Sequence, residues 1–329
     1  MTTLTRRDFY TTIFAEKFSP CGNYLVTADM YGKISVFNIT QALTVDIAID
    51  CKLPLNIFQA HENSIYCFAS TERYLISGGS TKIHGWLWKD ILHQKKPTPK
   101  WTFTPPSSSP FETPEANSLV VDPSTDSLIV GCGDNNVYVW DLNTGDLKHT
   151  LRGHEDYIHC VEFLSKTNQI ISAGEDGLVK FWDMRSCMSV EQIAPNELSM
   201  TSRSSVGKWV SCIATDKTED WLVCGGAAHS SVWHLRSKTA TAVLSTPKSC
   251  AQVIKFEDDF ILTAGTEPNV FKWSINGELR TKFPTSPKSI FSLEVNEHSN
   301  RVLAVSGSSP YVDISTNFKY KAFSLTVKG

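Results

Sequence analysis

The sequence predicts an all-β protein with the fold of a seven-bladed β-propeller, and three observations support this prediction. First, short apolar segments recur along the chain, and each has an equivalent position, usually occupied by an aromatic residue, that we call the slot. The slot residues are Phe37, Trp86, Trp140, Trp182, Trp233, Trp273 and Ser315. Second, a strand that closes on small residues precedes each segment, as YLISGG precedes IHGWLW. Third, the slots lie about 40–54 residues apart, which is room for four short strands per unit. Seven such sheets, packed against one another in a ring, bury both faces of each sheet.

The predicted propeller spans residues 12–327 and follows an N-terminal segment, residues 1–11. Its blades cover approximately residues 12–59, 60–104, 115–151, 154–193, 208–245, 250–284 and 288–327. The spacing is close to the period of WD repeats, about 40–45 residues, and the Gly, Asp and Asn turns favour antiparallel pairing. The strand YKAFSLTV at 320–327 is predicted to be the outer strand of the last blade, whereas residues 1–9 alternate poorly. We therefore expect the propeller to close within its C-terminal blade.

The fourth blade carries a predicted hydrogen-bond tetrad, His154, Ser172, Asp176 and Trp182. A buried indole N–H needs an acceptor, which the hydroxyl of Ser172 can supply. His154 can then bond Ser172, and Asp176 can accept from the imidazole. This is the pattern of a WD repeat, so the predicted fold is a WD-repeat β-propeller.

The other blades keep this pattern in part. The second blade has His61, Ser77 and Trp86 but Ser80 in place of the Asp, and the sixth has Thr263 and Trp273. In the third blade Val130 occupies the Ser position. Because the slot mainly needs apolar volume, these losses affect the predicted blade borders more than the fold.

An insertion is predicted between blades 2 and 3, at residues 89–115. It is expected to begin with a short helix, Asp90–Gln94, and to include WTF at 101–103 as an outer strand. Trp88, Trp101 and Phe111 lie in or beside it. These aromatic residues either pack locally against the blade or anchor a partner protein. Tyr157, in the loop after His154, is a further candidate for an exposed aromatic contact.

Composition and charge disfavour several functional classes. The net charge is −3 and the pI about 6.3, so the basic character typical of nucleic-acid-binding domains is absent. The nine cysteines have no CxxC spacing and are expected to be free thiols in a reducing compartment. No apolar run approaches the roughly 20 residues that span a membrane. No phosphate-binding loop, HExxH or GxSxG motif occurs, so we expect no enzymatic activity, metal, cofactor or small-molecule substrate.

Several stretches identify a resemblance to a known family: TIFAEKFSPCGNYLVTADMYGKISVF (12–37), FQAHENSIYCFASTERYLISGG (58–79), PEANSLVVDPSTDSLIVGCGD (114–134), LRGHEDYIHC (151–160), KWVSCIATDKTEDWLVCGG (208–226), VWHLRS (232–237) and YKAFSLTV (320–327). Over its whole length the sequence resembles the WD-repeat subunits of the THO/TREX mRNA export machinery, the THO subunit 6 family. The insertion at 89–115 does not share in the resemblance.

The resemblance implies a non-catalytic scaffold in the nucleus that couples transcription and processing of mRNA to export. It also implies partners: the coiled-coil THO subunits 5 and 7 and, indirectly, a DEAD-box helicase and an export adaptor. Contact with RNA would be mostly indirect.

A second function stays open. Trp182-Asp183-Met184-Arg185 matches the WDxR box of substrate receptors in cullin-based ubiquitin ligases. Asp183 and Arg185 would then contact the linker protein; alternatively, Asp183 caps the strand end and Arg185 pairs on the surface. The sequence does not indicate which propeller face binds partners.

Overall fold

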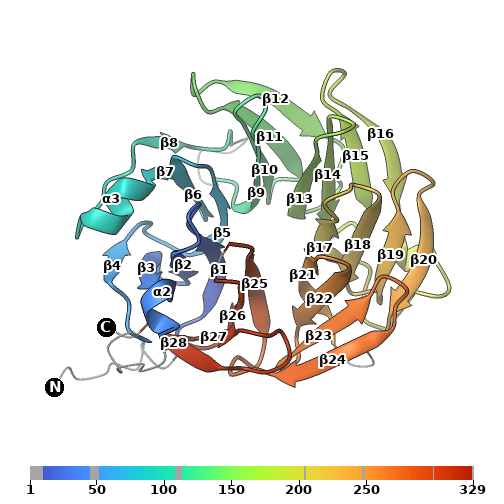
Figure 1. Ribbon diagram of the computed structural model, residues 1–329. Helices are drawn as coiled ribbons and strands as arrows, with labels where there is room; N and C mark the ends of the chain where they lie inside the picture. Colours follow the sequence, from blue (N-terminus) through green and yellow to red (C-terminus); the bar gives the residue numbers. More distant parts are fainter. Residues whose placement is uncertain are drawn as a thin grey trace. The chain divides into compact units, whose positions relative to one another are not determined.

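Four-stranded antiparallel sheets, with their strands in chain order, form the regular structure of the protein (Figure 1). The computed structural model describes residues 10–44, 52–107, 113–203, 205–246, 249–298 and 300–327, and seven such sheets lie within these ranges. The predicted fold class is confirmed: the chain is an all-β, seven-bladed WD-repeat β-propeller. It divides into two units, residues 1–104 with 283–329 and residues 105–282.

The first unit contains blades 1, 2 and 7. Its strands are β1 (Ile13–Phe18), β2 (Tyr24–Asp29), β3 (Lys33–Asn38), β4 (Asn56–Gln59), β5 (Ile65–Ser70), β6 (Tyr74–Gly79), β7 (Ile83–Leu87), β8 (Trp101–Phe103), β25 (Ile290–Asn296), β26 (Val302–Gly307), β27 (Tyr311–Ser315) and β28 (Phe323–Thr326). The first strands of these blades lie side by side, with β1 against β5 and β25.

The second unit contains blades 3 to 6. Its strands are β9 (Ala116–Asp122), β10 (Ser127–Cys132), β11 (Asn136–Asp141), β12 (Leu147–Arg152), β13 (Ile158–Leu164), β14 (Gln169–Gly174), β15 (Val179–Asp183), β16 (Met188–Ile193), β17 (Val210–Thr215), β18 (Trp221–Gly226), β19 (Ser230–His234), β20 (Thr239–Leu244), β21 (Ala251–Glu257), β22 (Phe260–Gly265), β23 (Asn269–Ser274) and β24 (Leu279–Pro284). Here too β13 packs against β9 and β17, and β17 against β21.

Helices are short and lie in the connections between strands. Among the described residues they are α2 (Ile39–Ala42), α3 (Trp88–His93) and the 3-10 helix η2 (Pro195–Glu197). Asn38 caps α2, since its side-chain oxygen accepts from the backbone N–H of Gln41 at 3.0 Å. The helix expected at Asp90–Gln94 begins two residues earlier, at Trp88. That difference buries Trp88 against the blade.

The alternating pattern of the strands places apolar side chains between neighbouring sheets. One buried cluster joins blades 4 and 5 and includes Ile171, Phe181 and Leu222. Another joins blades 1 and 7 and includes Phe37, the slot residue of blade 1. Since these sheets share their buried cores with neighbours in the same unit, no such blade is expected to be stable alone.

The closing strand of blade 7 comes from the C-terminal end of the chain. β28 pairs antiparallel with β27, with Leu325 opposite Val312, and Leu325 is fully buried. The sequence prediction placed this strand at 320–327, and the structure places it at Phe323–Thr326. Residues 1–9, the other candidate for this role, lie outside the described residues.

Candidate functional site

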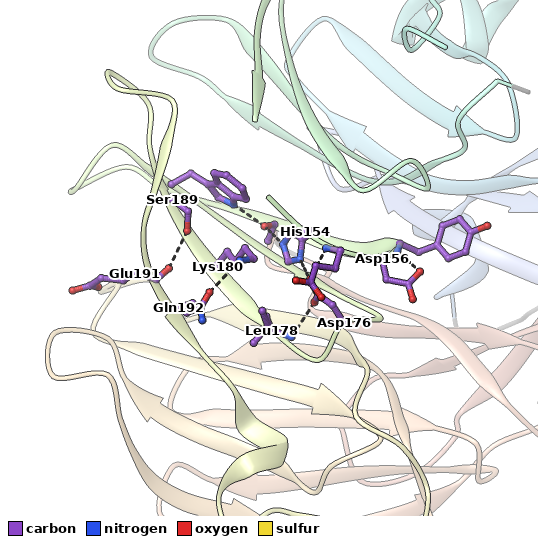
Figure 2. Close-up of polar contacts among 12 residues, drawn as sticks. His154, Asp156, Asp176, Leu178, Lys180, Ser189, Glu191 and Gln192 are labelled. Carbon is purple, nitrogen blue, oxygen red and sulfur yellow. Dashed lines mark hydrogen bonds and ion pairs between the residues drawn. The ribbon is translucent and has the colours of Figure 1, made fainter. Parts of the chain in front are cut away.

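The blade 4 tetrad is a continuous chain of hydrogen bonds. The indole N–H of Trp182 donates to Ser172 Oγ at 2.7 Å, and His154 Nε2 lies 2.7 Å from the same Oγ. On the other side of the ring, His154 Nδ1 lies 2.7 Å from Asp176 Oδ2 (Figure 2). All four side chains are buried. The hydroxyl of Ser172 therefore serves the tryptophan and the histidine and is not placed to attack a substrate.

Asp176 links the tetrad to the turn between β14 and β15. Its carboxylate accepts from the backbone N–H groups of Glu155 at 3.2 Å and Leu178 at 3.0 Å, in addition to His154. Burial by itself would raise the pKa of Asp176, but these hydrogen bonds outweigh it and hold the pKa below its ordinary value. The carboxylate is thus kept in the charged form that can accept all three bonds.

Blades 2 and 6 satisfy their tryptophans with a hydroxyl at the position that Ser172 holds in blade 4. In blade 2, Trp86 Nε1 donates to Ser77 Oγ at 2.9 Å, and His61 Nε2 lies 2.7 Å from that oxygen. In blade 6, Trp273 Nε1 donates to Thr263 Oγ1 at 2.9 Å.

Blade 5 uses a residue that the sequence pattern did not indicate. Cys224 occupies the Ser position of this blade, and Trp233 Nε1 donates instead to Ser231 Oγ at 2.8 Å. Ser231 is the register partner of Cys224 on the neighbouring strand. The acceptor for the indole N–H therefore lies on β19 in this blade, opposite the position on β18 that supplies it in the pattern.

His61 is neutral over the ordinary pH range. Burial lowers its pKa to about 3, helped by the nearby positive charges of His84 and Lys82. A neutral imidazole can pair with the Ser77 hydroxyl without the Asp that blade 2 lacks.

A buried acidic residue, Glu16, was not singled out by the sequence. It lies on β1 of blade 1 and is 4% exposed. Burial raises its pKa well above the ordinary value; the Ser306 hydroxyl opposes this, and the carboxylates of Glu294 and Asp313 in blade 7 raise it further. The three carboxylates come from distant parts of the sequence, so only the packing of blade 7 on blade 1 could reveal the cluster.

Two of the predicted partner-binding aromatics have different surroundings from those expected. Trp88 is 6% exposed, packs in the core cluster of blades 1 and 2, and donates its indole N–H to Ser70 Oγ at 3.3 Å. It is therefore a core residue, and its prediction as a partner anchor is wrong. The structural reason is that α3 begins at Trp88 and turns this side chain inward.

Trp101 is half-buried on β8. Its ring stacks on Phe103 at a centroid distance of 4.5 Å and covers Gly85, where an added Cβ would lie 2.0 Å from Trp101 Cε2. These contacts correspond to local packing rather than to a free anchor. Phe111, the third aromatic of this group, lies outside the described residues.

The other predicted contact residues are on the surface of blade 4. Tyr157 is 53% exposed, in the loop before β13. Asp183 Oδ1 accepts from the backbone N–H of Arg185 at 3.1 Å and lies 3.5 Å from its Nε, so Asp183 caps the strand end. The Arg185 side chain is 87% exposed, and both Tyr157 and Arg185 are open to a partner.

A groove that no sequence motif indicated lies beside blade 1. It has a volume of about 680 Å³ and is lined by residues 53–59 and 95–97. Its two walls come from segments that are nearly 40 residues apart, which a one-dimensional pattern does not bring together.

Within the ranges that the structure describes, no group of three or more His, Cys, Asp or Glu side chains is arranged to hold a metal ion. None of the described helices combines the length and the apolarity that crossing a membrane requires. The cysteines among the described residues are free thiols.

Comparisons with known proteins agree with this fold. Residues 113–309 match the family model described as "Nucleolar protein 10-like, N-terminal domain", a β-propeller. The "THO complex subunit 6 homolog" of Danio rerio is 38% identical over 96% of this chain and 97% of its own length. "THO complex subunit 6" of Homo sapiens is 38% identical over 96% of this chain and 92% of its own length. "THO complex subunit 6" of Arabidopsis thaliana is 30% identical over 80% of this chain and 75% of its own length. The chain, a WD-repeat β-propeller throughout its described blades, belongs to the THO complex subunit 6 family.

Proposed function

We propose that this chain is a non-catalytic scaffold subunit of a THO complex in the nucleus, where it supports the coupling of mRNA transcription and processing to export. The observation that carries the proposal is the extent of the family match. It covers 96% of this chain and 97% of the Danio rerio relative. A match of that extent spans every blade, and this supports a role shared with the family.

The proposed direct partners are the coiled-coil THO subunits 5 and 7, and the DEAD-box helicase and export adaptor would be reached through them. The buried polar groups of blade 4 support a non-catalytic role, because the Ser, His and Asp of the tetrad are engaged in holding Trp182. A sheet fold of this kind loses little conformational entropy when it presents a surface to a long helical partner. RNA contact is proposed to be mostly indirect, in keeping with the net charge of −3.

Affinity purification of the tagged full chain from nuclear extract tests this proposal. We expect THO subunits 5 and 7 to co-elute with it at a fixed stoichiometry through size-exclusion chromatography. If the chain elutes without them, the scaffold proposal fails. If the isolated chain binds RNA with an affinity that falls steeply with salt, the proposed indirect role in RNA contact is wrong.

A second candidate function is favoured by one specific observation, the exposure of Arg185 next to Asp183. In a WDxR-type substrate receptor of a cullin-based ubiquitin ligase, this guanidinium would contact the linker protein. Arg185→Ala should then abolish capture of a cullin linker while Arg236→Ala, at another exposed arginine, should not. Equal capture by both variants, or none by the wild-type chain, would exclude this function.

A further inference from the structure

The groove beside blade 1 runs along the edge of a strand. β4 is the last strand of its sheet, which has the order β1-β2-β3-β4, so its outer edge is paired with no other described strand. Successive side chains of a strand point to opposite faces, yet every residue from Asn56 to Gln59 lines the groove. A groove that contacts four consecutive residues of β4 must run along the edge of the strand, where the backbone of each residue is accessible. The groove therefore borders the edge of β4 that has no partner among the described strands.

The two ends of the groove are held by hydrogen bonds. Asn56 Nδ2 donates to the carbonyl oxygen of Gln94 at 2.9 Å, which fixes the segment leading to Lys95 beside the start of β4. At the other end, Gln59 Nε2 donates to the carbonyl oxygens of Tyr31 at 2.6 Å and His61 at 2.7 Å. The groove is thus largely preformed, as binding sites usually are.

The lining of the groove is aliphatic on one side and basic on the other. Leu53 and Leu55 are 37% and 58% exposed, whereas Phe58 is 5% exposed. Lys95 and Lys96 are both exposed, and none of the described residues that line the groove is an Asp or Glu. A second cavity of about 300 Å³ shares Leu53 and adds Lys52. Positive charge with no acidic partner in the lining is complementary to an acidic ligand.

We propose that the outer edge of β4 binds an extended segment of a partner protein as an added strand. The segment carries an aliphatic residue, which packs on Leu53 and Leu55, next to an aspartate or glutamate, which pairs with Lys95 or Lys96. The free edge supplies backbone hydrogen bonds and the side-chain positions supply specificity, which is how strand addition works in known peptide complexes. The inference goes beyond the proposed function and holds for any partner of this chemistry.

Among polymers with negative charge, the lining favours an acidic peptide over single-stranded RNA. Proteins that hold single-stranded nucleic acid commonly stack its bases on exposed aromatic side chains. The described apolar lining of the groove consists of leucine, isoleucine, proline and Phe58, and Phe58, the aromatic residue among them, is buried.

Selection from a random peptide display library of about twelve residues tests the proposal. The full chain is the bait, and the triple variant Leu55→Asp, Lys95→Glu, Lys96→Glu is the counter-bait. We expect the enriched peptides to share an aliphatic residue adjacent to Asp or Glu, and to bind the triple variant at least about tenfold more weakly. Methylation of alternate backbone nitrogens in an enriched peptide should weaken binding by a similar factor, because it removes strand hydrogen bonds.

A control variant, Leu279→Asp with Lys319→Glu, changes the same residue types at exposed positions that are not part of the groove lining and should bind the peptides like the wild-type chain. The milder variant Leu55→Ser, with its urea midpoint compared with that of the wild-type chain, separates lost binding from lost folding. Absence of enrichment, equal binding by wild type and triple variant, or insensitivity to methylation would each overturn the proposal. So would a labelled oligouridylate that loses its binding in the triple variant while no peptide is enriched.

Discussion

His154 Nδ1 lies 2.7 Å from Asp176 Oδ2, and both side chains are buried inside blade 4. Removing either partner leaves the other without its hydrogen bond in the interior, which costs about 1–3 kcal/mol. We therefore expect His154→Ala and Asp176→Ala each to lower the free energy of unfolding by that amount, measured by urea titration with tryptophan fluorescence. Tyr157→Ala, at an exposed position in the same loop, should change it by less than about 0.5 kcal/mol. Unchanged unfolding in both tetrad variants would refute a stabilising role of the tetrad.

The relocated acceptor in blade 5 allows a rescue experiment. Ser231→Ala should destabilise the protein by about 1–2 kcal/mol, because the indole N–H of Trp233 loses its partner at 2.8 Å. Adding Cys224→Ser places a hydroxyl at the position that Ser172 holds in blade 4. We expect the double variant to regain most of the lost stability. A double variant no more stable than Ser231→Ala would show that position 224 cannot serve the indole.

Glu16 should make the free energy of unfolding decrease as the pH rises. Its pKa is raised in the folded protein, so the unfolded chain releases the proton first and stability falls as pH rises from about 4.5 toward the folded pKa. Glu16→Gln keeps the shape and cannot titrate. The urea midpoint of this variant should exceed that of wild type at pH 8, and the gap should narrow at pH 5. Glu155→Gln, at an exposed carboxylate, should show no such gap; a Glu16→Gln midpoint below wild type at both pH values would contradict the assignment.

The last strand should be essential to blade 7. Truncation after Asn317 removes β28 with the fully buried Leu325, and also Phe318, which is 5% exposed. We expect the truncated chain to unfold at a lower urea concentration, and Leu325→Ala alone to cost about 2–5 kcal/mol. Tyr320→Ser, at a side chain that is 55% exposed, serves as the control. A truncated chain with the wild-type midpoint would mean that blade 7 closes without β28.

The sequence by itself determined the features that repeat along the chain. The seven slot residues, the small residues that close each preceding strand and the His154–Ser172–Asp176–Trp182 pattern are all local signals. They were readable because strand alternation and turn chemistry act over a few neighbouring residues. For the same reason the final strand near residues 323–326 could be predicted without knowing what it packs against.

The tertiary structure decided which side chains meet across strands and blades. Trp88, a candidate partner anchor, is buried because α3 starts two residues before the expected helix. Ser231 replaces Cys224 as the indole acceptor through cross-strand register, and Glu16 meets Glu294 and Asp313 through the packing of blades 1 and 7. The groove between residues 53–59 and Lys95–Lys96 likewise exists only once two separate segments are folded together. Such contacts depend on where distant residues come to lie in space, and a one-dimensional pattern holds no record of those distances.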